Sequence, residues 1–306
     1  MSAISKPRSF LAAARVANLP GVACHGITGA LLAQWLISRQ TIEPQAIDWG
    51  LVSMVALAGI LLCVAGNLLN DWHDRGWDRE FRPERALPSG HFRPATFLVL
   101  GSLALLLGVA AMFVLDARAG GIALAIAGCV VIYTRCHKTT VWSVVPLALC
   151  RGLLPIMGAF AVAGGLPWDT PALLVIPAFG AALFFWVCGL SLDARGESTG
   201  ASGRSLFPWL LLVAAPCVMV AALAGTLRFP WFALVPVGLW LVLVRGPFRR
   251  TAKQRVSALL AGLPLLDFLV LAPVWMLTAG APHGILWIPM LAFASGRLLQ
   301  RAASAT

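Results

Sequence analysis

Long apolar segments, separated by short charged or Gly/Pro-rich breaks, recur from one end of this 306-residue chain to the other. Most are long enough to cross a hydrocarbon core about 30 Å thick as an α-helix, the form in which a membrane segment satisfies its own backbone hydrogen bonds. The expected spans are 13–38, 50–72, 94–115, 119–134, 142–164, 171–192, 206–226, 230–244, 256–278 and 284–299. Because 230–244 is short, the pattern predicts nine or ten helices in an all-α, polytopic transmembrane bundle. We expect one domain over 1–306, with short helical cap loops on the cytoplasmic face.

The composition supports a membrane protein and excludes a soluble domain with a single anchor. Hydrophobic residues make up 59% of the chain and charged residues only 11%, against roughly 25% charged residues in an average soluble domain. The first apolar stretch contains Arg15, Asn18 and Pro20 and has no evident small-residue cleavage site, so we interpret it as a retained helix rather than a signal peptide. The seven cysteines show no CxxC spacing and indicate neither a zinc site nor a disulfide framework.

The net charge of +11 is explained by membrane orientation, and we expect no nucleic-acid partner. With ten spans and a cytoplasmic amino terminus, nineteen of the 23 Lys and Arg residues fall on the cytoplasmic side and three on the other, while Arg151 lies within a span. This asymmetry follows the positive-inside rule and favours ten spans. We therefore expect an integral protein of a bacterial inner (plasma) membrane with both termini in the cytoplasm.

The densest polar segment, 67–90, begins at the end of the second span and leaves the membrane on the cytoplasmic side. If the helix continues to about Arg82, where Pro83 discourages it, polar residues spaced by three and four positions share one face. These residues are Asn67, Asn70, Asp71, Asp74 and Asp78. Carboxylates on one helix face repel one another, so we expect a bound cation. Magnesium fits, because it takes hard oxygen ligands from one or two carboxylates together with substrate phosphates.

An alternative is that arginines of the same helix neutralise these acids. Asp71 with Arg75, and Asp78 with Arg82, are both spaced as i,i+4 ion pairs. This arrangement leaves Asp74 without a partner and does not account for two asparagines at the membrane boundary. We therefore prefer the magnesium site.

A second acidic segment follows the sixth span on the same side of the membrane. Asp193 and Glu197 are four residues apart, and Arg195 and Arg204 lie nearby. By themselves these residues are equally consistent with a solvated helix end. Facing the first cluster, they would complete two acidic sets able to hold two metal ions around a diphosphate.

Three motifs of the first polar segment together resemble the signature of the UbiA superfamily of intramembrane aromatic prenyltransferases. They are Asn70-x-x-x-Asp74-x-x-x-Asp78 with Asp71, Arg82-Pro-Glu-Arg85, and Leu87-Pro-Ser-Gly90. Weaker likenesses at 15–20 and 133–138 extend the resemblance over most of the chain. The resemblance implies a helical bundle that moves a prenyl group from a magnesium-chelated prenyl diphosphate to an aromatic or other lipophilic acceptor. The family's second motif, Asp-x-x-x-Asp, is here Asp193-x-x-x-Glu197, which marks a divergent member.

The resemblance also implies roles for individual residues. Asn70, Asp74 and Asp78 would bind one Mg²⁺, and Asp193 and Glu197 a second. Arg85, Lys138 and Arg204 would bind the diphosphate oxygens, and the catalytic set would be Asp71, Asp74, Asp78 and Asp193. Basic groups there would stabilise the charge that develops on the leaving diphosphate. Aromatic faces of an apolar pocket would stabilise the allylic cation left behind.

Two ionisable residues, Arg151 and Asp267, lie well inside predicted spans. A charge at this depth costs about 3 kcal/mol or more, so these residues are either functional or paired with each other. The candidate pocket residues are Asn18, Asn67 and Arg151. His25 and His73 are single imidazoles without a partner at ligand spacing, and we expect no role for them in the site.

Two other functions remain open. A lipid-handling or transport protein of the same fold would bind an isoprenoid without turning it over, an alternative that the altered second motif favours. An intramembrane terpene cyclase would release diphosphate without an acceptor. The expected partners are thus a prenyl diphosphate, a lipophilic acceptor and membrane lipid. The acceptor, the prenyl chain length and the oligomeric state are not determined, because function belongs to the site rather than to the fold.

Overall fold

The computed structural model describes residues 5–38, 46–162, 174–198, 206–224, 230–246, 251–277 and 283–302. Within these ranges the chain is helical and contains no strand, so the all-α prediction is confirmed. The α-helices are α1 (Lys6–Ala13), α2 (Leu19–Ser38), α3 (Trp49–Phe81), α4 (Pro94–Leu115), α5 (Ala117–Cys136), α6 (Val144–Val162), α7 (Val175–Ser198), α8 (Phe207–Ala224), α9 (Leu234–Arg245), α10 (Ala252–Ala261), α11 (Pro264–Leu277) and α12 (Trp287–Ala302). Short 3-10 helices precede α2, α6, α9 and α12: η1 (Val16–Asn18), η2 (Val141–Ser143), η4 (Trp231–Ala233) and η5 (His283–Leu286).

Within the described residues, each of the ten predicted spans overlaps a helical segment. In the described part of the chain, eight segments are long and apolar enough to cross a membrane, whereas α9, with 12 residues, and α12, with 16, are shorter. The segment predicted at 256–278 consists of two helices, α10 and α11, which meet at Gly262 and Leu263 and form one candidate span. These helices identify an integral membrane protein, as predicted.

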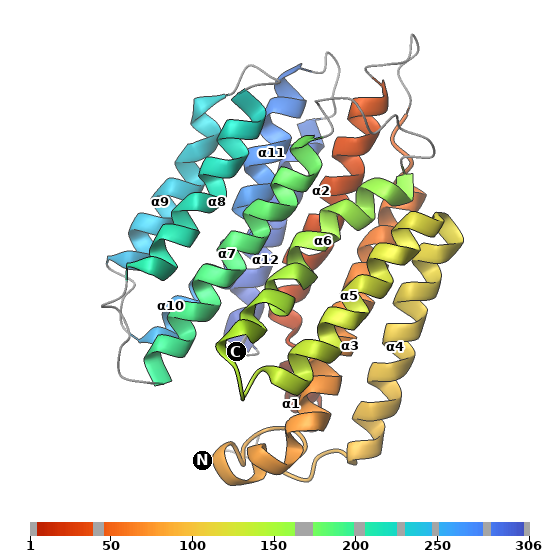
Figure 1. Cartoon of the computed structure of the whole chain (residues 1–306), viewed down its shortest axis with the longest axis vertical. Coiled ribbons are helices and arrows are strands. Elements are labelled where there is room, and N and C mark those ends of the chain that lie inside the picture. Colours follow the sequence, from red (N-terminus) through yellow and green to blue (C-terminus); the bar gives the residue numbers. More distant parts are fainter. Residues whose placement is uncertain are drawn as a thin grey trace.

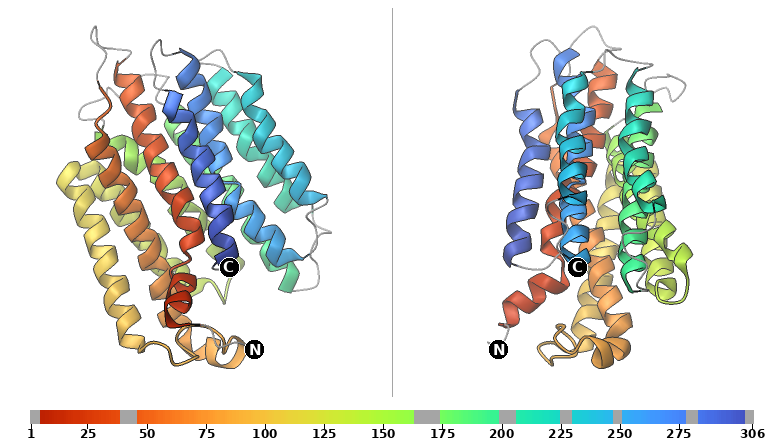
Figure 2. Two further views of the ribbon diagram at one scale, coloured as in Figure 1. Left: turned by 180° about the vertical axis from the view of Figure 1, so that it is seen from behind. Right: turned by 90° about the vertical axis from the view of Figure 1, so that its left-hand side faces the viewer.

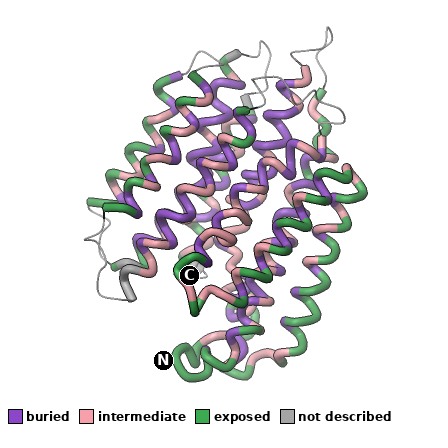
Figure 3. The backbone as a smooth tube through the Cα atoms, in the orientation of Figure 1, coloured by how far each residue is buried: buried purple, intermediate pink, exposed green. Residues whose placement is uncertain are grey.

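The long helices run side by side along one axis of the molecule (Figure 1). In this view α3, α4 and α5 lie on one side and α8 and α9 on the other, with α2, α6, α7 and α11 between them. Seen from behind, α12 lies against α2 (Figure 2). Figure 3 shows that α4 is largely exposed, whereas α2 and α7 are largely buried. The centre of the bundle is therefore built by α2, α6 and α7.

Small residues allow the central helices to approach closely. Gly29 of α2 lies against the backbone of Pro155 in α6, where an added Cβ would overlap the Pro155 carbonyl oxygen. Gly158 of α6 meets the backbone of Gly26 in α2 in the same way. Helices in lipid associate through such close packing, because no hydrophobic effect drives them together there. These contacts fix the position of α6, and of the side chains it carries, relative to α2.

The predicted polar face is carried by α3. Its 33 residues correspond to a length of about 50 Å, well beyond a hydrocarbon core of about 30 Å. The last turns of α3 therefore extend past the core at the lower end of the bundle in Figure 1. The helix begins after Asp48, whose side chain accepts a hydrogen bond from the Leu51 amide, and it ends at Phe81, close to the boundary predicted from Pro83.

Candidate active site

The C-terminal half of α3 presents one polar face to the interior of the bundle. The residues of this acidic face are Asn67, Asn70, Asp71, Asp74 and Asp78, and all are buried. Because these residues are spaced by three and four positions in α3, they lie on a single face of the helix, as the sequence predicted. Three buried carboxylates require cationic or hydrogen-bonding groups around them, because a buried charge without a partner is costly.

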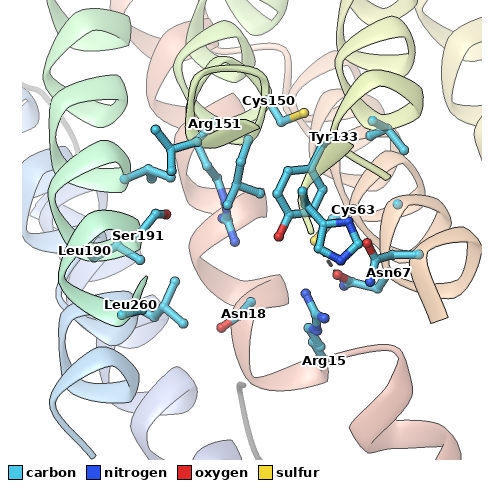
Figure 4. A pocket seen from close by; sticks show the side chains of 18 of the residues that line it. Arg15, Asn18, Cys63, Asn67, Tyr133, Cys150, Arg151, Leu190, Ser191 and Leu260 are labelled. Carbon is cyan, nitrogen blue, oxygen red and sulfur yellow. Dashed lines mark hydrogen bonds between the residues drawn. The ribbon is translucent and has the colours of Figure 1, made fainter. Parts of the chain in front are cut away.

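The acidic face borders a cavity of about 670 Å³ between α2, α3, α5, α6, α7 and α10. Charged residues of α3 and of the loop after α5 gather at one end, whereas residues such as Leu62, Ile126 and Leu154 form an apolar wall deeper in the bundle. The three predicted pocket residues, Asn18, Asn67 and Arg151, all line the cavity. Figure 4 shows them around it.

Asp74 lies at the centre of a network of polar contacts. Its Oδ2 lies 3.0 Å from Nε2 of His137 and accepts a hydrogen bond from Nδ2 of Asn70 at 3.3 Å. Its Oδ1 lies 3.2 Å from Nζ of Lys138 and 3.4 Å from Nδ1 of His73. The loop after α5 thus brings an ammonium group and an imidazole to the middle of the acidic face.

Arg85 joins the other two carboxylates of the acidic face. Its Nη1 donates to Oδ1 of Asp71 at 3.3 Å and to Oδ2 of Asp78 at 3.0 Å. Arg85 lies beyond the end of α3, so the chain must turn back on itself to make these contacts. One guanidinium therefore offsets the mutual repulsion of two buried carboxylates.

The i,i+4 ion pairs considered as an alternative are not formed in the described part of the chain. Arg75 instead donates from Nη1 to the carbonyl oxygen of Trp72 at 2.7 Å. Arg82 lies over the ring of Trp77, 5.6 Å from its centroid. Arg75 and Arg82 are consequently not the groups that neutralise the acids of α3.

Two buried oxygen atoms of the acidic face, Oδ1 of Asn70 and Oδ1 of Asp78, have no hydrogen-bond donor among the described residues. They lie two helical turns apart with Asp74 between them, so hard oxygen atoms line one side of the helix. This set fits Mg²⁺, which is normally held by one or two carboxylates, waters and substrate phosphates. In the described chain, no three or more His, Cys, Asp or Glu side chains are grouped to hold a metal by themselves.

The cavity as a whole is electropositive. Among the described residues that line it, six side chains are basic and two, Asp74 and Asp78, are carboxylates. The basic residues are Arg15, Arg82, Arg85, Lys138, Arg151 and Arg195. Arg15 also has a left-handed backbone with φ of 50°, a strained conformation of the kind found at functional sites. The excess of positive charge favours anionic ligands.

Comparison with known proteins assigns the family. The sequence model of the UbiA prenyltransferase family matches residues 31–261. The chain belongs to this family. Similar proteins include the protoheme IX farnesyltransferases of Gloeobacter violaceus, 30% identical over 237 residues (71% of this chain, 74% of the relative), and of Synechococcus elongatus, 30% identical over 228 residues (72% and 67%). The solved structure of a digeranylgeranylglyceryl phosphate synthase covers 90% of this chain and 100% of its own, with a TM-score of 0.60 and 19% identity.

As a member of the UbiA family, the protein is a membrane prenyltransferase, in agreement with the resemblance seen in its motifs. The solved structure has the same helical membrane fold over nearly the whole chain. The family match begins in α2 and ends with α10, so it includes the acidic face, the loop after α5 and α7.

The second acidic motif of this UbiA prenyltransferase is arranged differently from the first. Asp193 of α7 is buried, and its Oδ2 accepts a hydrogen bond from Nε of Arg255 in α10 at 2.6 Å. Neither Asp193 nor Arg255 is among the described residues that line the cavity. The side chain of Glu197 and all of Arg204 lie outside the described residues. Their predicted roles stay predictions.

Sequence reasoning assigned no role to three residues that form polar contacts at or near the site. His137 contacts Asp74, although only its neighbour Lys138 had been singled out. Arg195 fixes the same loop, because its Nη2 donates to the carbonyl oxygen of His137 at 2.5 Å. Arg255 pairs with Asp193. No local pattern predicts these contacts, since the partners lie 58 to 63 positions apart in the chain.

The two ionisable residues inside the spans do not pair with each other. Oδ2 of Asp267 lies 2.8 Å from Nδ1 of His25, and both side chains are fully buried. The alternative in which Arg151 pairs with Asp267 is therefore wrong. His25, for which no role in the site was expected, is the partner of Asp267 and is not among the described residues that line the cavity. His25 and Asp267 connect α2 with α11, whereas Arg151 lines the cavity.

Proposed function

We propose that this protein transfers a prenyl group from a magnesium-chelated prenyl diphosphate to a lipophilic acceptor held in the cavity. The observation that carries the proposal is that two buried oxygens beside an electropositive cavity, Oδ1 of Asn70 and Oδ1 of Asp78, have no hydrogen-bond donor in the described part of the chain. Oxygen ligands for Mg²⁺ next to basic side chains suit a chelated diphosphate. The apolar wall deeper in the cavity suits a prenyl chain.

The charged end of the donor would lie between α3 and the loop after α5. Asn70, Asp74 and Asp78 would hold Mg²⁺, which when bound stabilises the negative charge on the departing diphosphate. Lys138 and Arg85 contact the same carboxylates at 3.2 and 3.0 Å, and would turn to the diphosphate oxygens when the donor is bound. The Mg²⁺ held by the acidic face, Lys138 and Arg85 would thus all bind the diphosphate of the donor.

Asp71 would act through Arg85 rather than on the substrate. Its 3.3 Å contact with Nη1 orients the guanidinium toward the cavity. A second Mg²⁺ at Asp193 and Glu197 would require Asp193 to exchange its contact with Arg255 for the metal. We keep this second ion as a prediction, together with a diphosphate contact from Arg204.

Departure of the diphosphate would leave an allylic cation in the cavity. Tyr133, which stacks on His137 with ring centroids 5.1 Å apart, lines this space together with Trp77. An aromatic face can stabilise a cation by about 0.5 to 2 kcal/mol. The apolar wall would exclude water that otherwise captures the cation. Attack by the acceptor would then form the new bond and release a proton.

The substrates and the orientation are also proposals. The relatives in Gloeobacter violaceus and Synechococcus elongatus are named protoheme IX farnesyltransferases, which makes farnesyl diphosphate the first donor to test. The concentration of Lys and Arg on one side of the predicted spans supports a bacterial inner membrane protein whose acidic face lies on the cytoplasmic side.

The test is magnesium-dependent release of diphosphate from geranyl, farnesyl and geranylgeranyl diphosphate by the purified protein, with and without lipophilic acceptors. Release that requires Mg²⁺, an acceptor and Asp74 supports prenyl transfer. Release without an acceptor would instead indicate a terpene cyclase. Magnesium-dependent donor binding without turnover would indicate an isoprenoid-binding protein.

A further inference from the structure

Arg195 of α7 lines the cavity and binds the stretch of chain that joins α5 to α6. Its Nη2 donates one hydrogen bond to the carbonyl oxygen of His137 at 2.5 Å and another to Oγ of Ser143 at 2.7 Å. His137 directly follows α5, and Ser143 is the last residue of η2, directly before α6. One guanidinium nitrogen therefore bridges the two ends of segment 137–143, which contains the loop after α5.

The chemistry of both acceptors suits a cation. The carbonyl groups at the C-terminal end of a helix have no partner within the helix and carry the negative end of its dipole. His137 caps this end of α5, so a guanidinium satisfies its carbonyl oxygen. Ser143 is buried, and its Oγ in turn donates to the carbonyl oxygen of Thr140 at 2.9 Å. Arg195, Ser143 and Thr140 thus form a continuous chain of hydrogen bonds into the loop, begun by a charged and therefore strong donor.

The helix that carries Arg195 is itself firmly held. Asp193 and Arg195 are two residues apart in α7, which places their side chains about 200° apart around the helix axis. Asp193 is directed to α10, where it pairs with Arg255. On its other side α7 extends Arg195 to the loop, and the helix lies in the buried centre of the bundle (Figure 3). Arg195 therefore ties segment 137–143 to a fixed part of the protein.

The backbone that Arg195 binds carries the two groups that meet the centre of the acidic face. Nε2 of His137 lies 3.0 Å from Oδ2 of Asp74, and Nζ of Lys138 lies 3.2 Å from Oδ1 of the same carboxylate. Lys138 directly follows the residue whose carbonyl accepts from Arg195. A shift of this backbone would move both groups relative to Asp74, and a displacement of about 1 Å at an active site can cost about 100-fold in rate.

We propose that Arg195 is a positioning residue of the donor site, which acts through the loop after α5 and not on the substrate itself. It limits how far the backbone of His137 and Lys138 can move from Asp74, so that Lys138 stays within reach of the diphosphate. The inference rests on the proposed prenyl transfer for the role of Lys138. The second acidic motif, Asp193-x-x-x-Glu197, thereby serves the first motif through the basic residue between its two acids.

The first measurement is amide hydrogen exchange of the purified protein without donor. The amides of segment 137–143 should exchange about tenfold faster in Arg195→Gln and about threefold faster in Ser143→Ala, because each change removes a hydrogen bond that holds the segment. The matched control is Arg135→Gln, which changes an exposed arginine in the last turn of α5 that is not among the described residues lining the cavity. It should keep the wild-type exchange. Unchanged exchange of segment 137–143 in Arg195→Gln overturns the inference.

The second measurement is the affinity for a non-transferable farnesyl thiolodiphosphate with Mg²⁺, determined by calorimetry. Arg195→Gln should weaken binding about tenfold, and Arg195→Lys should weaken it less, because an ammonium group keeps the charge but lacks the planar fork. In a Lys138→Gln background, Arg195→Gln should weaken binding by no more than about threefold, since the side chain that it positions is already gone. A tenfold loss in both backgrounds overturns the inference, because Arg195 then acts on the donor directly or on the fold as a whole.

Failure of the proposed prenyl transfer would look different. Wild-type protein that binds no farnesyl thiolodiphosphate with Mg²⁺ contradicts the donor site, while hydrogen exchange without donor still decides whether Arg195 holds the loop. Thermal unfolding of each variant shows whether weaker binding reflects a lost fold. If Arg195→Gln does not fold, Ser143→Ala carries the same test, because it removes one acceptor of the same guanidinium. Faster exchange together with weaker donor binding in Ser143→Ala then supports the inference, and wild-type values for both overturn it.

Discussion

Nζ of Lys138 lies 3.2 Å from Oδ1 of Asp74, so the loop after α5 touches the centre of the acidic face of α3. The same ammonium group lies 4.0 Å from the centroid of the Trp77 ring. Lys138 is thus held between a carboxylate and an aromatic face at the position proposed for the diphosphate. In the proposed binding mode the donor's diphosphate takes this lysine from Asp74, so the loop after α5 would rearrange in each turnover.

Asp74→Asn should lower the rate of diphosphate release by about 100-fold or more, because the amide keeps the shape of the side chain and removes the charge proposed to hold Mg²⁺. The measurement is release from farnesyl diphosphate in the presence of an acceptor. Glu80→Gln is the matched control, since Glu80 is exposed on the same helix and should be dispensable. A near wild-type rate for Asp74→Asn would remove this carboxylate from the mechanism.

Chelation of Mg²⁺ should abolish prenyl transfer while changing the unfolding temperature little. The reason is that Lys138, His137 and Arg85 already contact the carboxylates without a metal. Adding Mg²⁺ back should restore activity, and adding Mg²⁺ together with farnesyl thiolodiphosphate should raise the unfolding temperature more than either alone. A large loss of stability on chelation would show that the ion is structural instead.

Arg85→Gln should lower the free energy of unfolding by about 2 to 4 kcal/mol, because Asp71 and Asp78 then remain buried without their cation. Arg79→Gln, an exposed change in the last turn of α3, should have little effect. Adding Asp71→Asn to Arg85→Gln should recover part of the loss. If the double variant is no more stable than the single one, Arg85 does not act by neutralising Asp71.

The buried pair of Asp193 and Arg255 should behave as a coupled unit. Asp193→Leu and Arg255→Met should each cost about 3 kcal/mol, because each removes one member of a buried ion pair, while the double variant should cost clearly less than their sum. Unfolding of all four proteins in a denaturant series gives the coupling energy. If the losses in the free energy of unfolding simply add in the double variant, the two side chains do not stabilise the protein through their mutual contact.

Helical spacing explains why much of the site could be predicted from the sequence. The side chains of Asn70, Asp74 and Asp78 share a face wherever α3 forms, so the acidic face is a local property. Arg85 and Lys138 were found through their positions in recognisable motifs. The contacts of Arg85 and Lys138 with the acidic face could not be predicted, because the turn after α3 and the loop after α5 bring these residues back to that face only in the folded bundle.

The sequence by itself determined that the chain is an all-α membrane protein, where its long apolar segments lie and which face of α3 is acidic. Hydrophobic length and side-chain periodicity are properties of consecutive residues, so they can be read directly. Only the tertiary structure decided that His25 pairs with Asp267, that Arg255 pairs with Asp193 and that Arg151 faces a cavity. These contacts depend on how each helix is rotated and packed against others, and hydrophobic patterns constrain that rotation weakly in lipid because most sides of a spanning helix are apolar.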